Sequence, residues 1–170
     1  MATHSKEPQV SDYLLKPGYI YLPEESTAIS AVLGSSVSVT LFDRKLKTGG
    51  MNHFLYPRIH EKGRTTSLYG NVAVVTLIDM MLANGSDRKH LQSQIFGGAF
   101  NSEYSDRDIG ADNVGEARRI LKSKGITVVS EDVGGILGRK VIFNTHDSEI
   151  ALLKVNQLRR SDWYPYEGDR

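Results

Sequence analysis

The 170-residue sequence contains no cysteine. This absence excludes a disulfide scaffold, a thiolate metal site and, taken literally, a cysteine nucleophile. A charge imbalance is also missing, because 21 Lys and Arg residues accompany 20 Asp and Glu residues. The chain therefore has no electrostatic footprint for nucleic acid or for an anionic membrane. No apolar run approaches the roughly 20 residues of a membrane helix, and residues 1–9 lack the apolar stretch of a signal peptide. We expect a soluble, cytoplasmic protein without membrane insertion.

The remaining composition is that of an ordinary globular protein, with 39% hydrophobic and 24% charged residues. The length suits one domain. We predict a disordered N-terminus over residues 1–9, a domain over 10–158, and a polar C-terminal tail over 159–170. The tail carries Trp163 and is expected to be peripheral.

Periodicity separates helices from strands along the chain. Apolar residues at helical spacing predict helices over 71–84 and 113–124, and Asn113 with Glu116 resembles a capping box for the second one. Strand patterns occupy the remaining apolar segments: 37–42, 51–56, 92–96, 126–130, 140–144 and 150–155. This order predicts an α+β fold, with mixed or antiparallel, hairpin-rich sheets that resemble a β-sandwich and are flanked by the two helices.

The runs 37–42 and 51–56 are predicted to form a hairpin. If its loop were residues 43–46, Phe42 would face Lys47 and Ser36 would face His53. A slip of one or two residues would move this pair by only a few ångströms. A serine beside a histidine is a candidate nucleophile with its base. Taken singly, each residue has a simpler structural interpretation, Ser36 as a loop-to-strand junction and His53 as a buried strand histidine.

Metal and phosphate sites find no support in the sequence. The other four histidines have no partner at i, i+4 spacing and no HExxH motif, so no metal site is predicted. The glycine pairs at 49–50, 97–98 and 134–135 fit neither G-x-G-x-x-G nor the P-loop motif, and turn or bulge roles explain them better.

Several short motifs, in this order, resemble the CheD family of chemoreceptor glutamine deamidases. The motifs span roughly residues 10–155 and are Lys16-Pro17-Gly18, Gly34-Ser35-Ser36-Val37, Gly49-Gly50-Met51-Asn52-His53-Phe54, Ile95-Phe96-Gly97-Gly98-Ala99, Ile109-Gly110-Ala111-Asp112-Asn113-Val114 and Glu131-Asp132-Val133-Gly134-Gly135. The family pattern at the second motif is Gly-Ser-Cys-Val. The resemblance therefore places the family's nucleophilic cysteine at Ser36, its histidine at His53, and a threonine at Ser30.

The resemblance also implies a function. Family members hydrolyse the side-chain amides of receptor glutamines to glutamate and ammonia by a papain-like mechanism, without a cofactor. The backbone at Gly34 and Ser35 is the expected oxyanion site. The implied partners are the cytoplasmic helices of methyl-accepting chemoreceptors, as substrate, and a CheC-type phosphatase.

Ser36 is the departure from the family pattern, and it predicts an inactive or crippled enzyme because a hydroxyl is much harder to deprotonate than a thiol. Three explanations remain open. The first is an engineered Cys-to-Ser change in an active deamidase, the second a natural, catalytically silent homologue that binds receptors or CheC, and the third a serine amidase or esterase. We favour the first, because a decayed site would be expected to lose His53 as well.

Overall fold

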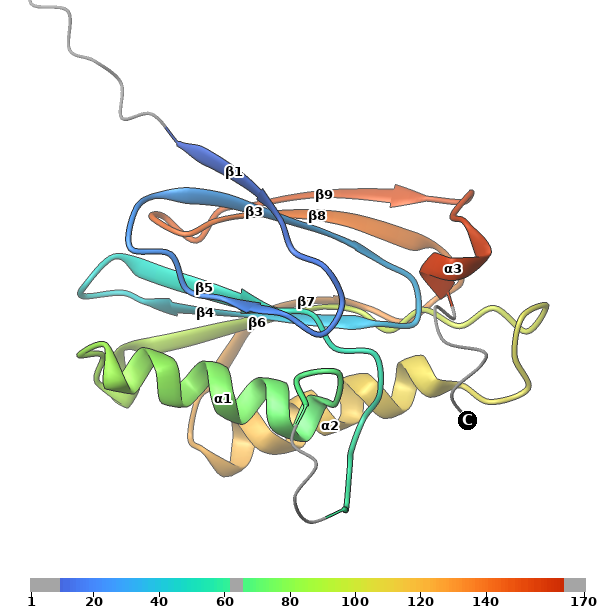
Figure 1. Cartoon of the computed structure of the whole chain (residues 1–170), viewed down its shortest axis with the longest axis horizontal. Helices are drawn as coiled ribbons and strands as arrows, with labels where there is room; N and C mark the ends of the chain where they lie inside the picture. The colour runs from blue at the N-terminus through green and yellow to red at the C-terminus, as the bar shows by residue number, and fades with distance from the viewer. Residues whose placement is uncertain (1–9, 62–65, 164–170) are drawn as a thin grey trace, which may run out of the picture.

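The structure, a computed structural model, describes residues 10–61 and 66–163 and has three layers (Figure 1). The N-terminus predicted to be disordered lies outside these residues. The first layer is a four-stranded sheet in the order β1 (Ser11–Leu14), β3 (Thr27–Leu33), β8 (Gly138–Asn144), β9 (Ile150–Val155). The middle layer is a five-stranded sheet in the order β2 (Ile20–Tyr21), β5 (Thr48–Asn52), β4 (Val37–Asp43), β6 (Leu91–Gly97), β7 (Thr127–Val133).

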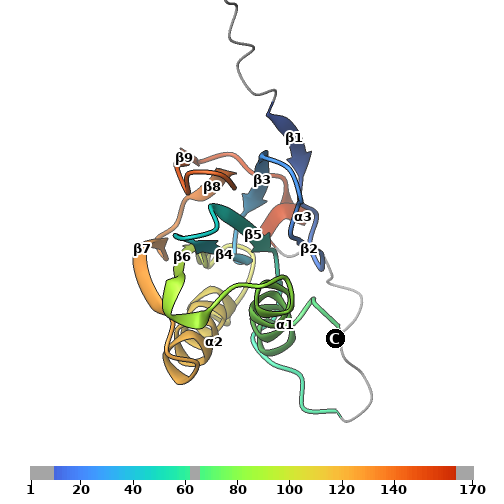
Figure 2. The ribbon, with the colours of Figure 1, turned by 90° about the vertical axis from the view of Figure 1, so that its left-hand side faces the viewer.

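Two helices form the third layer and cover the outer face of the five-stranded sheet, as the end-on view shows (Figure 2). They are α1 (Gly70–Ala83) and α2 (Ile109–Ser123); the shorter elements are a 3₁₀ turn, η1 (Arg88–His90), and α3 (Arg160–Trp163). Among the described residues, no helix is long and apolar enough to cross a membrane. The predicted α+β class, with two mixed sheets and two main helices, is confirmed.

The second helix starts earlier than predicted. The Asp108 carboxylate accepts the N–H of Ala111 at 2.9 Å and caps the helix, so α2 begins at Ile109. Asn113 therefore lies inside the helix, and the prediction that it caps the N-terminus is wrong. Its side chain is free to bind elsewhere.

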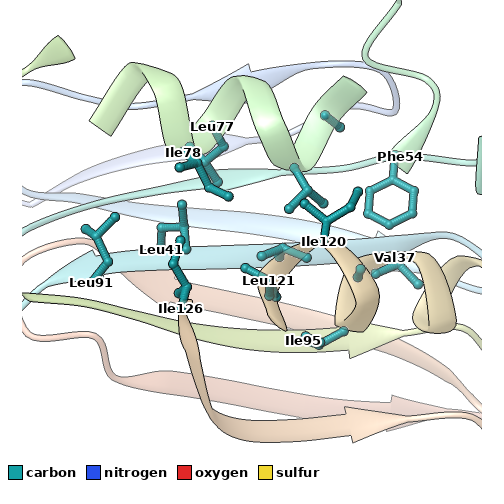
Figure 3. Close-up of a cluster of buried hydrophobic side chains, with 14 of the residues drawn as sticks. Val37, Leu41, Phe54, Leu77, Ile78, Leu91, Ile95, Ile120, Leu121 and Ile126 are labelled. Atoms are coloured by element: carbon teal, nitrogen blue, oxygen red, sulfur yellow. The ribbon is translucent and has the colours of Figure 1, made fainter. Parts of the chain in front are cut away.

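Strand alternation divides the interior into two cores. In β4, Val37, Val39 and Leu41 face the helices, and they pack there with Leu77 and Ile78 of α1 and with Ile120 and Leu121 of α2 (Figure 3). Phe42, on the opposite face of β4, packs between the two sheets with Met51, Phe96 and Phe143. The centre of the middle sheet is thus buried on both faces, which explains why β4 and β5 carry mostly apolar or small residues in succession.

The C-terminal tail was expected to be peripheral, and for Trp163 this expectation is wrong. Trp163 in α3 is only 3% exposed and packs with Ala99, Tyr104 and Leu158. Gly34 admits this segment because a Cβ at position 34 would approach the Asp162 carbonyl oxygen to 2.6 Å. The large apolar surface of the indole explains the docking.

We predict that Trp163→Ala lowers the free energy of unfolding by about 3 kcal/mol, the range for truncating a buried aromatic residue. The matched control is Tyr19→Ala, which removes an aromatic ring that is 60% exposed and should cost less than about 1 kcal/mol. Urea denaturation followed by circular dichroism measures both, because Trp163 is the only tryptophan and its removal abolishes the fluorescence signal. Equal losses would contradict the docking of this segment.

Candidate functional site

Ser36 lies in the short connection between β3 and β4 and is held through its backbone. Its carbonyl accepts the N–H of Gly98 at 2.9 Å, and the Gly34 carbonyl accepts the N–H of Ala99 at the same distance. Gly97 has φ +105°, and a Cβ there would collide with the Ser36 carbonyl oxygen. Only glycine combines this dihedral with so close an approach. The end of β6 therefore fixes the position of Ser36.

His53 follows β5 at a break in the sheet. The Asn52 side chain inserts into the ladder, where its Oδ1 accepts the N–H of Val39 at 2.8 Å. The backbone of His53 pairs with the β1–β2 loop instead: its N–H donates to the Tyr19 carbonyl at 3.2 Å, and its carbonyl accepts the Gly18 N–H at 2.8 Å. These bonds continue the pairing of β2 with β5, while the next residue, Phe54, pairs with Val37 of β4, so the His53 backbone is held from both sides.

The two side chains meet. Ser36 Oγ lies 2.9 Å from His53 Nε2, and His53 Nδ1 lies 3.1 Å from the carbonyl oxygen of Leu15. A carbonyl can only accept, so Nδ1 carries the hydrogen, and in the neutral ring Nε2 then accepts from the Ser36 hydroxyl. This is the tautomer in which a histidine can act as general base toward residue 36.

Burial keeps the imidazole neutral. His53 is 2% exposed and Ser36 is 3% exposed. Desolvation lowers the pKa of His53 from its ordinary 6.5 to about 4, and the hydrogen bond to the Leu15 carbonyl opposes this shift only in part. A base this weak is poorly matched to a serine hydroxyl at neutral pH. The third group of the site is a neutral carbonyl, whereas serine hydrolases place a carboxylate there.

The predicted register of the hairpin is wrong by two residues. Phe42 pairs with Gly49 instead of Lys47, and the loop is residues 44–47. The Asp43 carboxylate accepts the N–H groups of Lys45 and Leu46 and shapes this turn, in which Lys47 adopts φ +55°. The pair nevertheless forms, because the observed register continues to Val37 facing Phe54, which leaves Ser36 and His53 as diagonal neighbours on the same face.

Ser30, the third residue suggested by the resemblance, is not brought to the pair through its side chain. Its hydroxyl donates to the Tyr13 carbonyl at 3.5 Å. Its own carbonyl accepts the N–H of Leu15 at 2.8 Å. Ser30 thus reaches His53 only through Leu15, whose carbonyl orients the imidazole.

Ser35, the residue before the nucleophile position, is fixed by the C-terminal segment. Its hydroxyl donates to the Trp163 carbonyl at 2.6 Å. Within residues 10–61 and 66–163, the backbone N–H groups of Ser35 and Ser36 have no hydrogen-bond acceptor. Unpaired N–H groups beside a nucleophile are the donors that an oxyanion hole requires.

A cleft of about 220 Å³ opens above the pair. It is bounded by the β1–β2 loop on one side and by the C-terminal segment on the other. Its lining residues are Leu14, Leu15, Lys16, Pro17, Val32, Ser36, His53, Leu55, Arg159, Ser161 and Asp162. The site is therefore open to solvent, and the cleft has room for one side chain that ends in an amide group.

Sequence reasoning missed two contributors, Leu15 and Asn113. Leu15 acts through a backbone carbonyl and leaves no signal in the residue pattern. Asn113 is fully buried and contacts the site segments, and it did leave a signal, since it falls on the same helical face as Ala117 and Ile120. A polar residue on an apolar stripe indicates a specific partner.

Comparisons with known proteins agree with the resemblance. A family model described as CheD chemotactic sensory transduction matches residues 57–154. The chain is similar to a probable chemoreceptor glutamine deamidase CheD of Trichlorobacter lovleyi, with 37% identity over 84% of this chain and 90% of the relative. A protein of that name, CheD 1, from Anaeromyxobacter dehalogenans is 41% identical over 78% of each chain. The CheD 2 protein of Geobacter sulfurreducens is 34% identical over 92% of this chain and 96% of the relative.

Ser36 and His53 precede the span that the family model matches. The similarity to the Geobacter protein includes both positions, because any continuous stretch that covers 92% of 170 residues contains them.

We predict that Gly97→Ala destabilises the protein by about 2 kcal/mol more than Gly85→Ala. Both glycines have positive φ, but a Cβ at Gly85 meets nothing within 4 Å, whereas one at Gly97 meets the Ser36 carbonyl. The strain of the dihedral is thus common to both variants, and the difference isolates the contact with the site. Equal free energies of unfolding in urea would mean that β6 does not fix Ser36.

The pKa of His53 predicts how stability depends on pH. Between its folded value of about 4 and its ordinary 6.5, only the unfolded chain binds the proton. The free energy of unfolding should therefore fall as the pH drops through this window, by about 3 kcal/mol in total. Urea denaturation from pH 7.5 to 4.5 measures the slope.

His53→Gln should remove this contribution, and His146→Gln, which alters an exposed histidine, should retain it. An unchanged slope in His53→Gln would show that His53 is not buried in its neutral form.

Proposed function

Because this chain belongs to the CheD family, we propose that it is a chemoreceptor glutamine deamidase in which Ser36 occupies the position of the nucleophile. The hydrogen bond between Ser36 Oγ and His53 Nε2, in a cleft open to solvent, is the observation that supports this proposal. Glutamines on the cytoplasmic helices of chemoreceptors are the proposed substrate, and a CheC-type phosphatase is a further proposed partner. The proposed location is the cytoplasm, where these receptor helices lie.

The proposed reaction needs a nucleophile at position 36. With cysteine there, the thiol proton passes to His53 Nε2, and the thiolate attacks the amide carbon of the glutamine. Free N–H groups at Ser35 and Ser36, in the loop that begins at Gly34, hold the oxyanion. The imidazolium then protonates the departing ammonia and leaves a thioester. Water, deprotonated by His53, opens the thioester and releases glutamate.

Serine at position 36 weakens this sequence at its first step. Its hydroxyl is far less acidic than a thiol, and His53 is desolvated and oriented by a neutral carbonyl. The C–O bond is also shorter than a C–S bond, which sets the nucleophile back from the amide carbon and slows the attack. We therefore propose that the Ser36 form is inactive or nearly so. The intact pair favours a change introduced into an active enzyme, and the sequence of the gene at codon 36 decides this directly.

The test is deamidation of receptor cytoplasmic fragments, followed by mass spectrometry of their glutamines. We predict that Ser36→Cys converts specific glutamines to glutamate at least about 100-fold faster than the Ser36 form. The matched control is Ser38→Cys, which introduces a thiol two residues further along the chain, in β4 and outside the lining of the cleft, and should leave the rate unchanged. Ser36→Cys combined with His53→Gln should lose the gained activity.

Three other outcomes would redirect the assignment. No conversion by Ser36→Cys, with receptor fragments still bound, would favour a silent homologue that acts as a binding module. Rapid conversion by the Ser36 form, abolished in Ser36→Ala, would favour a serine amidase. Neither conversion nor binding would contradict a role on chemoreceptors.

A further inference from the structure

Asn113 links the two segments that carry Ser36 and His53. It lies in the second turn of α2 and is fully buried. Its Nδ2 donates to the Ser35 carbonyl at 3.0 Å and to the Leu55 carbonyl at 2.9 Å. The first contact is at the residue next to the nucleophile position, and the second is two positions after the histidine. A single amide group therefore bridges both halves of the site.

The orientation of this amide is fixed by its partners. Both are carbonyl oxygens, which only accept, so the nitrogen must face them. Asn113 Oδ1 is then left buried with no hydrogen-bond partner among the described residues. Asparagine is also a poor residue inside a helix. Asparagine at position 113 therefore destabilises the fold in two ways, through the unpaired Oδ1 and through its low helix propensity. Both are explained if the hydrogen bonds to Ser35 and Leu55 serve the site.

Few other bonds join these segments directly. Val37 and Phe54 exchange two backbone hydrogen bonds of 3.0 Å each, and Asn52 Oδ1 accepts the Val39 N–H at 2.8 Å, both in the register of the β4–β5 ladder. The strand pairing ends at Val37 and Phe54. The amide of Asn113 binds Ser35 and Leu55, one residue further on each side, and so extends the attachment beyond the end of the pairing.

We propose that Asn113 is a positioning residue that holds position 36 and His53 at hydrogen-bond distance. Its role rests on the proposed function in one respect, namely that position 36 carries the nucleophile. In Asn113→Ala the carbonyls of Ser35 and Leu55 lose a buried donor, and the two segments separate as water or rearranged backbone satisfies them.

The test uses the reactivity of a thiol at position 36 and requires no receptor. In Ser36→Cys, the rate of alkylation by iodoacetamide is measured from pH 5 to 10 and reports the pKa of the thiol. An aligned imidazole should hold this pKa below the ordinary value of about 8.5. Adding Asn113→Ala should return the midpoint to about that value and slow alkylation at neutral pH by roughly tenfold.

Asn71 provides a matched control in the same Ser36→Cys background. It lies in the first turn of α1 and also ties a helix to a loop, with Nδ2 donating to the Ile59 carbonyl at 3.0 Å and Oδ1 accepting the Ile59 N–H at 3.1 Å. Asn71→Ala removes a comparable pair of side-chain hydrogen bonds away from the cleft and should leave the pKa of the thiol unchanged. A general loss of stability would affect both variants, whereas a positioning role affects only Asn113→Ala.

An unchanged pH profile in Asn113→Ala overturns the proposal, and so does an ordinary thiol pKa in Ser36→Cys itself, since no aligned pair would then exist. If Asn113→Ala is unfolded by circular dichroism, Asn113→Asp takes its place. Aspartate has the same shape, but a carboxylate cannot donate to the two carbonyls, so the same loss is expected. A lowered thiol pKa without glutamine conversion would contradict the deamidase function and leave the role of Asn113 intact.

Discussion

The hydrogen bond between Ser36 Oγ and His53 Nε2 depends on backbone contacts that converge from several parts of the chain. The end of β6 holds the Ser36 carbonyl, and the β1–β2 loop holds the backbone of His53. The Leu15 carbonyl then selects the tautomer of the imidazole. No single element of secondary structure contains the site, which instead lies where the ends of the two sheets and the start of α2 meet. The sandwich is therefore the means by which distant backbone groups are held within hydrogen-bond distance.

The environment of His53 suits a thiol better than a hydroxyl. Burial lowers the pKa of the imidazole, and a neutral carbonyl gives an imidazolium less support than a carboxylate would. A thiol compensates because its own proton is lost readily and the resulting thiolate stabilises the imidazolium beside it. A hydroxyl offers no such compensation. The environment of the histidine therefore supports the proposal that position 36 carries a thiol in the active enzyme.

The sequence predicted the elements more accurately than their connections. Helical spacing placed α1 within one residue at each end, and strand alternation located the hairpin that leads to His53. The register failed by two residues because the Asp43 turn places the loop at residues 44–47, a local detail that apolar alternation does not encode. Leu15 could not be found at all, since a backbone carbonyl has no residue signature. The docking of Trp163 was missed because a short polar segment gives no periodic signal.

The polar groups left without partners indicate what this arrangement costs. Among the described residues, Asn52 Nδ2 and Asn113 Oδ1 are buried without hydrogen bonds, and each belongs to a side chain whose other polar atom serves the site. An unsatisfied buried group costs about 1–3 kcal/mol, an appreciable share of the stability of a domain of this size. Apolar residues at positions 52 and 113 would avoid this cost and would also remove the ladder break and the bridge. The site therefore persists at the expense of stability, as expected where a fold positions reactive groups instead of only packing its core.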